Sequence, residues 1–444
     1  MLKRFSLENF SSFKLKNYLD LTADNTEIHS NHICDFKKVK ILKSAIIYGA
    51  NASGKSNLIK ALHYAKDIVT LGLDNVETYK KYFRLDKESI NKPTIFEFEL
   101  EIDNKFYSFG FSSLLSEKKI IEEWLYEIGR KVPEKIYERI NNEITIGKSL
   151  EKNKDIKKRF EIYIDDMKNQ ANQLFLSEIS NKNLDFKEIV IINNIFNWFD
   201  EKLIILYPHT EFGGKAFLNK NENLVKIFCE YLNKFDTGII NISSIEENFE
   251  DSLKHLPEKI KKQIEKDVLN KKTKRISIGD SKGGLYTIYK NDNNELKVQK
   301  LGLIHSEEVD EIFELSDESD GTRRLFDLIP LIRMFSKDFT IVIDEFDRSL
   351  HPNLTKKFFE LFYNLNKNKT QLIVSTHEST LLDLQLVRRD ELWFVKKDKK
   401  GASQTYPLNQ FNLRHDKKID KDYLMGRFDA IPMIDIYDEI NMEI

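Results

Sequence analysis

The stretch SAIIYGANASGKSNLIKAL, residues 44–62, decides how this chain begins to fold. Its first residues are apolar, and the spacing from Gly49 to Gly54, Lys55 and Ser56 is typical of a phosphate-binding loop between a strand and a helix. The two glycines allow consecutive backbone N–H groups to point inward at phosphate oxygens. The stretch therefore predicts a nucleoside triphosphate site.

Each part of this loop has an expected role. Lys55 places an ammonium on the β- and γ-phosphates, and Ser56 offers its hydroxyl to Mg²⁺. The helix from about Asn57 directs its positive end at the anion. We expect ATP and Mg²⁺ as cofactors, with Ser56 also a metal ligand. The nucleotide-binding residues expected here are Gly49, Ala50, Asn51, Ala52, Ser53, Gly54, Lys55, Ser56 and Asn57.

The amino-acid composition limits which classes of protein this chain can belong to. The 444 residues include 70 basic and 72 acidic residues, and 41% of the residues are hydrophobic. This indicates a soluble globular chain of two or three domains without a global polycation to hold nucleic acid. Cys34 and Cys229 form no metal-ligand spacing, and no apolar run reaches the length of a membrane span. We expect a cytoplasmic protein without membrane contact.

The sequence pattern changes twice along the chain. Residues 1–114 read as strands around one helix, including the alternating segments PTIFEFELEI and KFYSFGFSS. Residues 115–312 contain lysine-rich segments such as IEEWLYEIGRKVPEKIYERI, which predict an inserted helical arm or lid. In residues 313–444, two apolar strands flank a helix, so parallel strands resume. We expect an α/β fold: a P-loop sheet and an antiparallel accessory sheet, interrupted by a largely helical insertion.

A second group of candidate residues follows the strand in TIVIDEFDRSLHP, residues 340–352. Asp344 and Glu345 come at the carboxyl end of that strand, where open α/β sheets gather their ligands. Asp344 suits the Mg²⁺ shell, and Glu345 suits the orientation and deprotonation of an attacking water. An Asp-Glu pair in this position is often only a surface turn. The phosphate-binding loop upstream favours the catalytic interpretation.

A third candidate, His377, ends the apolar strand in QLIVSTHES, residues 371–379. An imidazole at a strand end can donate to a γ-phosphate oxygen and so sense whether the phosphate is present. A lone histidine is more often structural. Its position one strand–helix–strand unit after Asp344 and Glu345 favours a catalytic role at the phosphate.

Taken in this order, the three segments resemble the ABC-type ATPase heads of the SMC and OLD families. In such heads, a serine and a glycine at a helix start complete the nucleotide site of a second subunit. The candidate is SDESDGTRRLFDLIP, residues 316–330, and the resemblance implies that Ser319 and Gly321 contact the γ-phosphate held by that second subunit. A simple helix cap is the alternative. Asp347 matches the family's dimer-contacting aspartate, so the resemblance implies a homodimer around ATP.

One position departs from the family pattern. ABC heads carry a glutamine between the phosphate-binding loop and the arm, whereas the first glutamine here is Gln170, inside the insertion. Residues near KYFRLD, including Arg84, are candidates for its place, and we assign them no role.

Longer phrases narrow the resemblance. LENFSSFK, PTIFEFEL, ESDGTRRL, STHESTLLD and YLMGRFDAIP are similar to the compact bacterial RloA/AbiL-type ATP-binding proteins among the OLD-like ATPases. Such proteins are commonly encoded beside a separate effector and associated with phage defence. The resemblance implies a sensor ATPase that controls a separately encoded nuclease or toxin. After STHES, the chain shows neither a TOPRIM carboxylate cluster nor the Arg/His pair of anticodon nucleases.

Two other functions stay open from the sequence. An SMC-like head could grip duplex DNA in DNA maintenance or repair, with phosphate contacts from the basic residues 254–275. A charge run of this kind is more often a solvated face. A subunit that drives a membrane transporter is disfavoured, because those heads need the missing glutamine for coupling.

Overall fold

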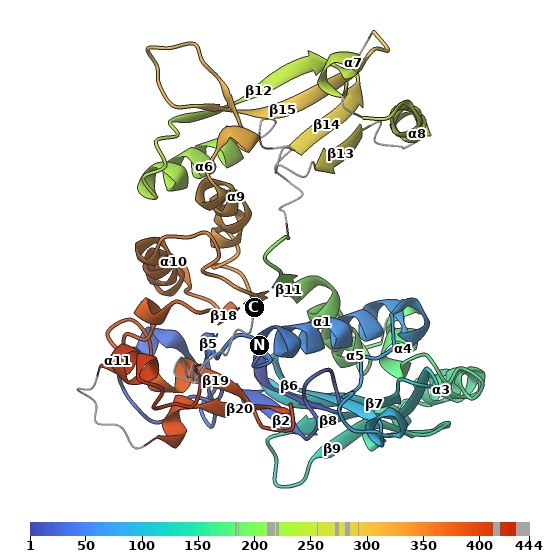
Figure 1. Cartoon of the computed structure of the whole chain (residues 1–444). Coiled ribbons are helices and arrows are strands. Elements are labelled where there is room, and N and C mark those ends of the chain that lie inside the picture. Colours follow the sequence, from blue (N-terminus) through green and yellow to red (C-terminus); the bar gives the residue numbers. More distant parts are fainter. Residues whose placement is uncertain are drawn as a thin grey trace, which may run out of the picture. The chain divides into compact units, whose positions relative to one another are not determined.

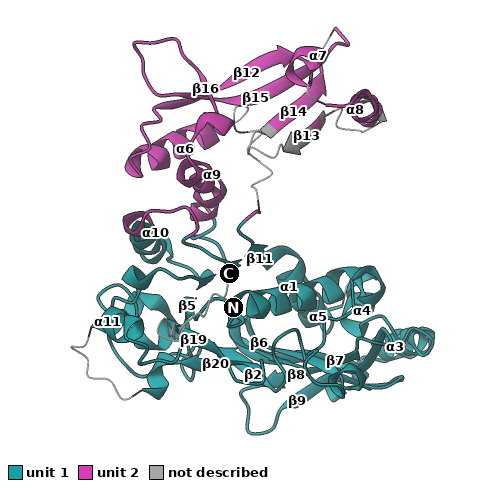
Figure 2. Cartoon of the chain, in the orientation of Figure 1, with its two compact units in different colours: residues 1–208, 334–347, 355–444 teal, residues 209–333, 348–354 magenta. Residues whose placement is uncertain are grey.

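The chain forms two compact units in the computed structural model (Figure 2). Unit 1 comprises residues 1–208, 334–347 and 355–444, and unit 2 comprises residues 209–333 and 348–354. The structure describes residues 1–182, 184, 186–210, 218, 222–254, 256–270, 275–279, 285–291, 293–411 and 418–431. The unit boundaries differ from the expected divisions after residues 114 and 312. Residues 115–208 belong to unit 1 because the strand that follows residue 114 continues the accessory sheet.

A six-stranded sheet in unit 1 carries the phosphate-binding loop, with strand order β11-β17-β18-β5-β19-β20 (Figure 1). Strands β17, β18 and β5 are buried along their whole length, which explains why their sequences are almost continuously apolar. The first five strands are parallel, and β20 is antiparallel to β19. The parallel strands predicted from the sequence are therefore confirmed. The strands are β11 (Leu203–Leu206), β17 (Thr340–Ile343), β18 (Gln371–Ser375), β5 (Ser44–Tyr48), β19 (Leu392–Lys397) and β20 (Ser403–Pro407).

Helices follow two of these strands. Helix α1 (Lys55–Leu71) begins directly after the loop that follows β5, and α10 (Pro352–Leu365) lies between β17 and β18 in the chain. Because β17, β18 and β5 are parallel and adjacent in that order, their carboxyl ends meet at one edge of the sheet. A short hairpin of β3 (Ile33–Asp35) and β4 (Lys40–Leu42) and the helix α11 (Ile419–Leu424) complete this part.

A seven-stranded antiparallel sheet is the second part of unit 1, in the order β10-β9-β8-β7-β6-β1-β2. Its inner face carries Phe96, Phe98 and Phe109, which share one buried core with Leu58 and Leu62 of α1. This confirms the predicted accessory sheet. The strands are β1 (Leu2–Glu8), β2 (Asn17–Asp20), β6 (Thr94–Ile102), β7 (Lys105–Leu114), β8 (Lys119–Ile128), β9 (Glu134–Ile140) and β10 (Glu143–Ile146).

The predicted helix over IEEWLYEIGRKVPEKIYERI is wrong. These residues form β8 and β9: β8 pairs with β7, and β9 pairs with β8. Trp124 and Tyr126 lie on the outer face while Leu125 is buried, so the segment follows the period of two of a strand. Among the described residues from 115 to 208, the α-helices follow β10. They are α2 (Lys148–Glu151), α3 (Lys154–Met167), α4 (Phe175–Asn181) and α5 (Val190–Asn197).

Unit 2 contains a second antiparallel sheet together with helices. Its core includes Phe249, Val268, Ile288 and Val298. The expectation of a largely helical insertion is corrected here as well, because alternating segments pair as strands. The strands are β12 (Asn241–Asn248), β13 (Arg275–Gly279), β14 (Leu285–Lys290), β15 (Leu296–Ile304) and β16 (Phe313–Glu314). The helices are α6 (Glu222–Lys234), α7 (Phe249–Ser252), α8 (Glu258–Asn270) and α9 (Asp320–Ile332).

Within the described residues, none of the helices combines the length and the apolar character that a bilayer crossing requires.

Candidate functional site

At two positions, the loop after β5 approaches neighbouring atoms too closely for any residue but glycine. A β-carbon on Gly49 would collide with the carbonyl oxygen of Val395, and one on Gly54 would collide with Oγ of Ser403. Gly54 also has a φ of 121°, which side-chain-bearing residues rarely adopt. Both glycines of the predicted phosphate-binding loop are therefore required by the local geometry.

Lys55 begins α1 and folds back over this loop. Its Nζ donates hydrogen bonds to the carbonyl oxygens of Gly49 at 2.8 Å and Ala50 at 3.2 Å. Burial lowers the pKa of Lys55 from 10.5 to about 8, although the carboxylates that follow β17 act in the opposite direction. Among the described residues, the hydrogen-bond partners of this desolvated ammonium are carbonyl oxygens. An anionic partner would therefore stabilise its charged form strongly.

The carboxylates predicted after β17 lie at the same sheet edge. Asp344 Oδ1 accepts a hydrogen bond from Ser56 Oγ at 3.2 Å and another from Ser375 Oγ at 2.5 Å. The backbone N–H of Glu345 donates to the same Ser375 Oγ at 2.9 Å. Ser375, at the end of β18, therefore joins both carboxylate residues. The sequence interpretation missed this role, although a small polar residue at the end of a neighbouring parallel strand is a usable signal.

Glu345 occupies an unusual backbone conformation. Its φ is 47°, in the left-handed region that non-glycine residues seldom adopt. Among the described residues, no hydrogen bond or ion pair engages its carboxylate, which is half-buried. The carboxylate of Glu345 is thus available to accept a proton from a water molecule at this edge.

His377 and Asp347 are brought together beside these groups. The backbone N–H of His377 lies 3.3 Å from each Asp347 carboxylate oxygen, and Thr376 Oγ1 donates to Asp347 Oδ1 at 2.7 Å. Desolvation, followed by the nearby Lys55 ammonium, lowers the pKa of His377 below its ordinary value. Burial and Lys55 therefore favour the neutral imidazole, which has one N–H donor.

Two further serines support the loop from distant parts of the sequence. Ser403 Oγ, on β20, donates to the carbonyl oxygen of Ser53 at 2.5 Å and lies 2.8 Å from Ser12 Oγ. Asn57 Nδ2 donates to Ser12 Oγ at 2.8 Å. Ser12 and Ser403 were not predicted, because no local pattern relates residues 391 positions apart.

The site fits a nucleoside triphosphate with Mg²⁺. The buried Oγ of Ser53 has no hydrogen-bond partner among the described residues, so one donor of the loop is left for a ligand. Ser56 and Asp344 present hard oxygens 3.2 Å apart. Mg²⁺ in phosphate sites needs only one or two such protein ligands beside phosphate oxygens and waters. Lys55 and the loop would hold the phosphates.

The predicted Ser319 and Gly321 lie in unit 2, at the start of α9. Ser319 Oγ accepts a hydrogen bond from the backbone N–H of Thr322 at 3.1 Å, so the capping role holds. A β-carbon on Gly321 would lie 2.7 Å from the carbonyl oxygen of Ser349, in the segment that follows Asp347. Ser319 is exposed at the start of this 13-residue helix, and Gly321 is half-buried.

The candidates for the missing glutamine gain no role. Arg84 is exposed and has no hydrogen bond or ion pair within the part of the chain that the structure describes. Gln170 is exposed in the turn after α3.

The strand–loop–helix and the carboxylates at the same sheet edge define a P-loop nucleotide-binding domain. The chain belongs to the family described as "AAA domain, putative AbiEii toxin, Type IV TA system", whose profile matches residues 44–181 and 193–383. This is a family of nucleotide-binding ATPases. No curated protein matches the sequence.

Three solved SMC head domains are similar to the chain. The SMC head of Thermotoga maritima is 15% identical, with a TM-score of 0.38, and the match covers 91% of this chain and 98% of that one. An SMC head bound to the C-terminal winged-helix domain of ScpA is 14% identical, with a TM-score of 0.41, over 94% and 99%. An SMC head bound to the C-terminal domain of ScpA from Pyrococcus furiosus is 14% identical, with a TM-score of 0.40, over 92% and 97%. At such low identities and TM-scores, the function has to be argued from the chain's own residues.

Proposed function

We propose that this chain binds and hydrolyses ATP as a homodimer and acts as a cytoplasmic sensor that controls a separately encoded nuclease or toxin in phage defence. The observation that carries the ATPase part is the meeting of Lys55, Ser56, Asp344 and Glu345 at one sheet edge, with a buried ammonium and an unpartnered Ser53 hydroxyl. The free thiols Cys34 and Cys229 agree with a reducing compartment.

Each side chain has a defined task in this proposal. ATP with Mg²⁺ supplies a phosphoryl group whose charge is partly neutralised by the metal. Lys55 and the loop N–H groups hold the phosphates, while Ser56 and Asp344 hold the ion. Glu345 orients a water molecule and takes its proton. The neutral His377 donates an N–H to a γ-phosphate oxygen and so distinguishes ATP from ADP.

The second half of the site comes from another copy of the chain in this proposal. Ser319 and Gly321 start a 13-residue helix whose first N–H groups form an anion-binding end. Asp347 contacts the same partner through the loop that it begins. The ATPase rate then depends on protein concentration, because a single copy holds only one half of each site.

The role in controlling an effector rests on the RloA/AbiL-type resemblance and on the family description. That description names a toxin and a type IV toxin–antitoxin system. Co-purification of this chain with the product of the adjacent gene, with and without ATP, tests this part. No association in either state contradicts it.

The Glu345→Gln variant tests the ATP-driven dimer. Removal of the base keeps the phosphate ligands, so the variant should bind ATP, lose on the order of 100-fold in turnover and accumulate as a dimer. Light scattering with saturating ATP measures the mass, and Glu360→Gln, an exposed position on α10, is the control. A Glu345→Gln variant that binds ATP and stays monomeric contradicts the proposal.

A second candidate function, an SMC-like ATPase that binds DNA, is favoured by one observation on α8. Lys259, Lys262 and Lys266 are exposed on one face of this helix. None has a carboxylate within ion-pair distance among the described residues, whereas Lys261 pairs with Glu250 at 2.9 Å. Residues 255 and 271–274 of the predicted basic segment 254–275 lie outside the described residues.

Binding to duplex DNA with ATP at two salt concentrations tests this candidate. Three phosphate contacts would make the affinity fall steeply with salt. The absence of ATP-dependent binding removes the candidate.

A further inference from the structure

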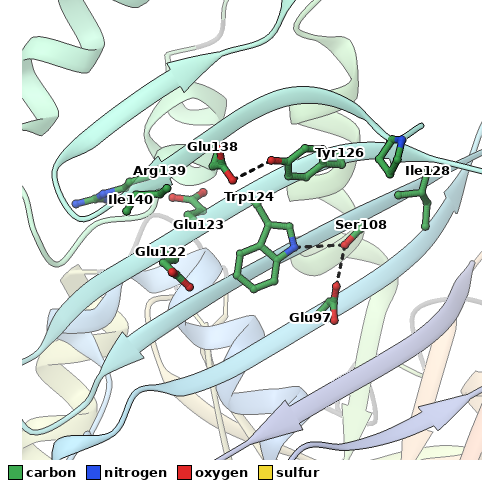
Figure 3. A pocket seen from close by; sticks show the side chains of 11 residues that line it. Glu97, Ser108, Glu122, Glu123, Trp124, Tyr126, Ile128, Glu138, Arg139 and Ile140 are labelled. Atoms are coloured by element: carbon green, nitrogen blue, oxygen red, sulfur yellow. Dashed lines mark hydrogen bonds between the residues drawn. The ribbon is translucent and has the colours of Figure 1, made fainter. Parts of the chain in front are cut away.

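A groove on the outer face of the seven-stranded sheet has a volume of about 410 Å³ (Figure 3). A row of four residues crosses it, one from each of β6, β7, β8 and β9: Glu97, Gly110, Trp124 and Glu138 are direct cross-strand neighbours. Side chains alternate along a strand, so this row faces away from the phenylalanine core. In Figure 1, helices α1, α4 and α5 lie on the core side of the sheet.

Trp124 is held in this groove by specific contacts. Its indole lies against Gly110, where a β-carbon would collide with the ring. Trp124 Nε1 donates to Ser108 Oγ at 3.3 Å, and Ser108 Oγ donates to Glu97 at 3.1 Å. Trp124 is half-buried, whereas Trp198 and Trp393 are only 4% and 3% exposed. An aromatic ring fixed in this way on an uncovered sheet face is typical of a protein-binding surface.

The groove is negatively charged. Its lining includes the carboxylates of Glu97, Glu122, Glu123 and Glu138, with Arg139 as the only cation among the lining residues. The side chain of Arg139 is buried and donates to the backbone carbonyl oxygens of Asn141, Gln173 and Gln170. The guanidinium of Arg139 is therefore engaged inside the protein.

Three of the four carboxylates remain accessible. Glu123 is buried and accepts hydrogen bonds from the backbone N–H groups of α4, but Glu97, Glu122 and Glu138 each accept a hydrogen bond from a neutral hydroxyl. Glu97 also pairs with the exposed Lys16 at 3.1 Å, and Glu138 lies 3.7 Å from Lys135. Neither of these lysines lines the groove, so its interior keeps an excess of negative charge.

We infer that this groove binds a basic segment of a partner protein, with an arginine or lysine side chain laid over the indole of Trp124. The indole face attracts a cation, and the carboxylates of Glu122 and Glu138 complete the site on either side. The same carboxylates repel nucleic acid and free nucleotides. The inference does not rest on the ATPase, because binding is measured without nucleotide.

A labelled peptide of alternating glycine and arginine, acetylated at its amino end, is a suitable probe for the full chain. A matched peptide with citrulline in place of arginine keeps the shape and loses the charge. Fluorescence anisotropy at low salt should show about tenfold weaker binding of the citrulline peptide. Acrylamide quenching of tryptophan fluorescence should fall when the arginine peptide binds, because Trp124 is the accessible tryptophan.

Substitutions in the groove locate the binding. Glu122→Gln and Glu138→Gln should each weaken peptide binding by about two- to fivefold, and Trp124→Leu by a similar factor. Glu117→Gln, in the exposed turn between β7 and β8, is the matched control and should change nothing. ATPase activity should be unaffected in all four variants.

Three results overturn the inference. The first is equal binding of the two peptides, and the second is unchanged binding in Glu122→Gln and Glu138→Gln. The third is a doubling of the mass measured by sedimentation in the absence of peptide, if the Glu122→Gln substitution abolishes that doubling. Such a result would assign the groove to a second copy of the chain.

Discussion

The two compact units differ in how much of a nucleotide site each one holds. In unit 1, Lys55, Asp344 and His377 follow three parallel strands that are adjacent in the sheet. Asp344 accepts hydrogen bonds from Ser56, next to Lys55, and from Ser375, two residues before His377. In unit 2, the corresponding feature is a single exposed helix start, capped by Ser319. In the proposed site, unit 1 binds the phosphates and the metal, whereas the start of α9 in unit 2 contributes N–H groups and a hydroxyl.

From this difference we infer which step of the proposed reaction depends on each unit. Changes in unit 1 should act on nucleotide binding and on chemistry within the same copy. Changes at the start of α9 should leave binding intact and reduce turnover, because in the proposed dimer Ser319 acts on the nucleotide of another copy. The predictions below separate these two kinds of effect.

The largest effect is expected for Lys55→Ala. This variant removes the buried ammonium that the phosphates need, so ATP affinity should fall on the order of 100-fold or more. Binding of a fluorescent ATP analogue measures the loss, and Lys60→Ala, exposed on the same helix, is the control. Normal ATPase activity in Lys55→Ala would refute the whole assignment of the site.

The pH dependence of ATP binding should report the same ammonium. Lys55 has a pKa of about 8 without nucleotide, and a bound anion raises that pKa, so binding takes up a proton above pH 8. Affinity should therefore fall as pH rises, becoming about tenfold weaker at pH 9 than at pH 7. Titrations across this range test the prediction, with Lys55→Arg as a control that stays charged. A wild-type affinity that is constant from pH 7 to pH 9 contradicts it.

A smaller effect is expected from Glu318→Gln in unit 2. Glu318 precedes Ser319, and its Oε1 lies 2.7 Å from Nε2 of His305, at the end of β15. Loss of this pair should loosen the start of α9 and reduce the maximal ATPase rate by about two- to threefold without changing ATP affinity. Glu307→Gln, exposed nearby, is the control. If Glu318→Gln changes the ATP affinity and leaves the maximal ATPase rate unchanged, the start of α9 does not have the role in turnover proposed here.

The sequence alone predicts that these unit 1 residues meet at one sheet edge, for a physical reason. Gly49, Gly54 and Lys55 lie close together in the chain, and Asp344 and His377 each follow a buried apolar strand. Parallel strands bring such ends together without further information. Ser12 and Ser403 could not be predicted, since they support the loop only through tertiary contacts.

The strands β8 and β9 show why the accessory sheet was only partly predicted. Glu123 takes an inward position where an apolar residue is expected, and this hides the alternation of the segment. The structure tolerates the buried carboxylate because it accepts the backbone N–H groups of Phe175 and Leu176 at 2.6 and 2.9 Å, where α4 begins. Burial nonetheless raises the pKa of Glu123. Apolar residues at Trp124, Leu125 and Ile128 then imitate a helical face.

Mixing two inactive variants tests the division of the site most directly. Lys55→Ala keeps a working helix start, and Ser319→Arg keeps a working phosphate-binding loop; each alone should have little ATPase activity. In a one-to-one mixture of the two, half of the dimers contain one complete site, so activity should return to about a quarter of the wild-type rate. A mixture that stays as inactive as its components, although both variants fold and dimerise, would contradict a site shared between two copies.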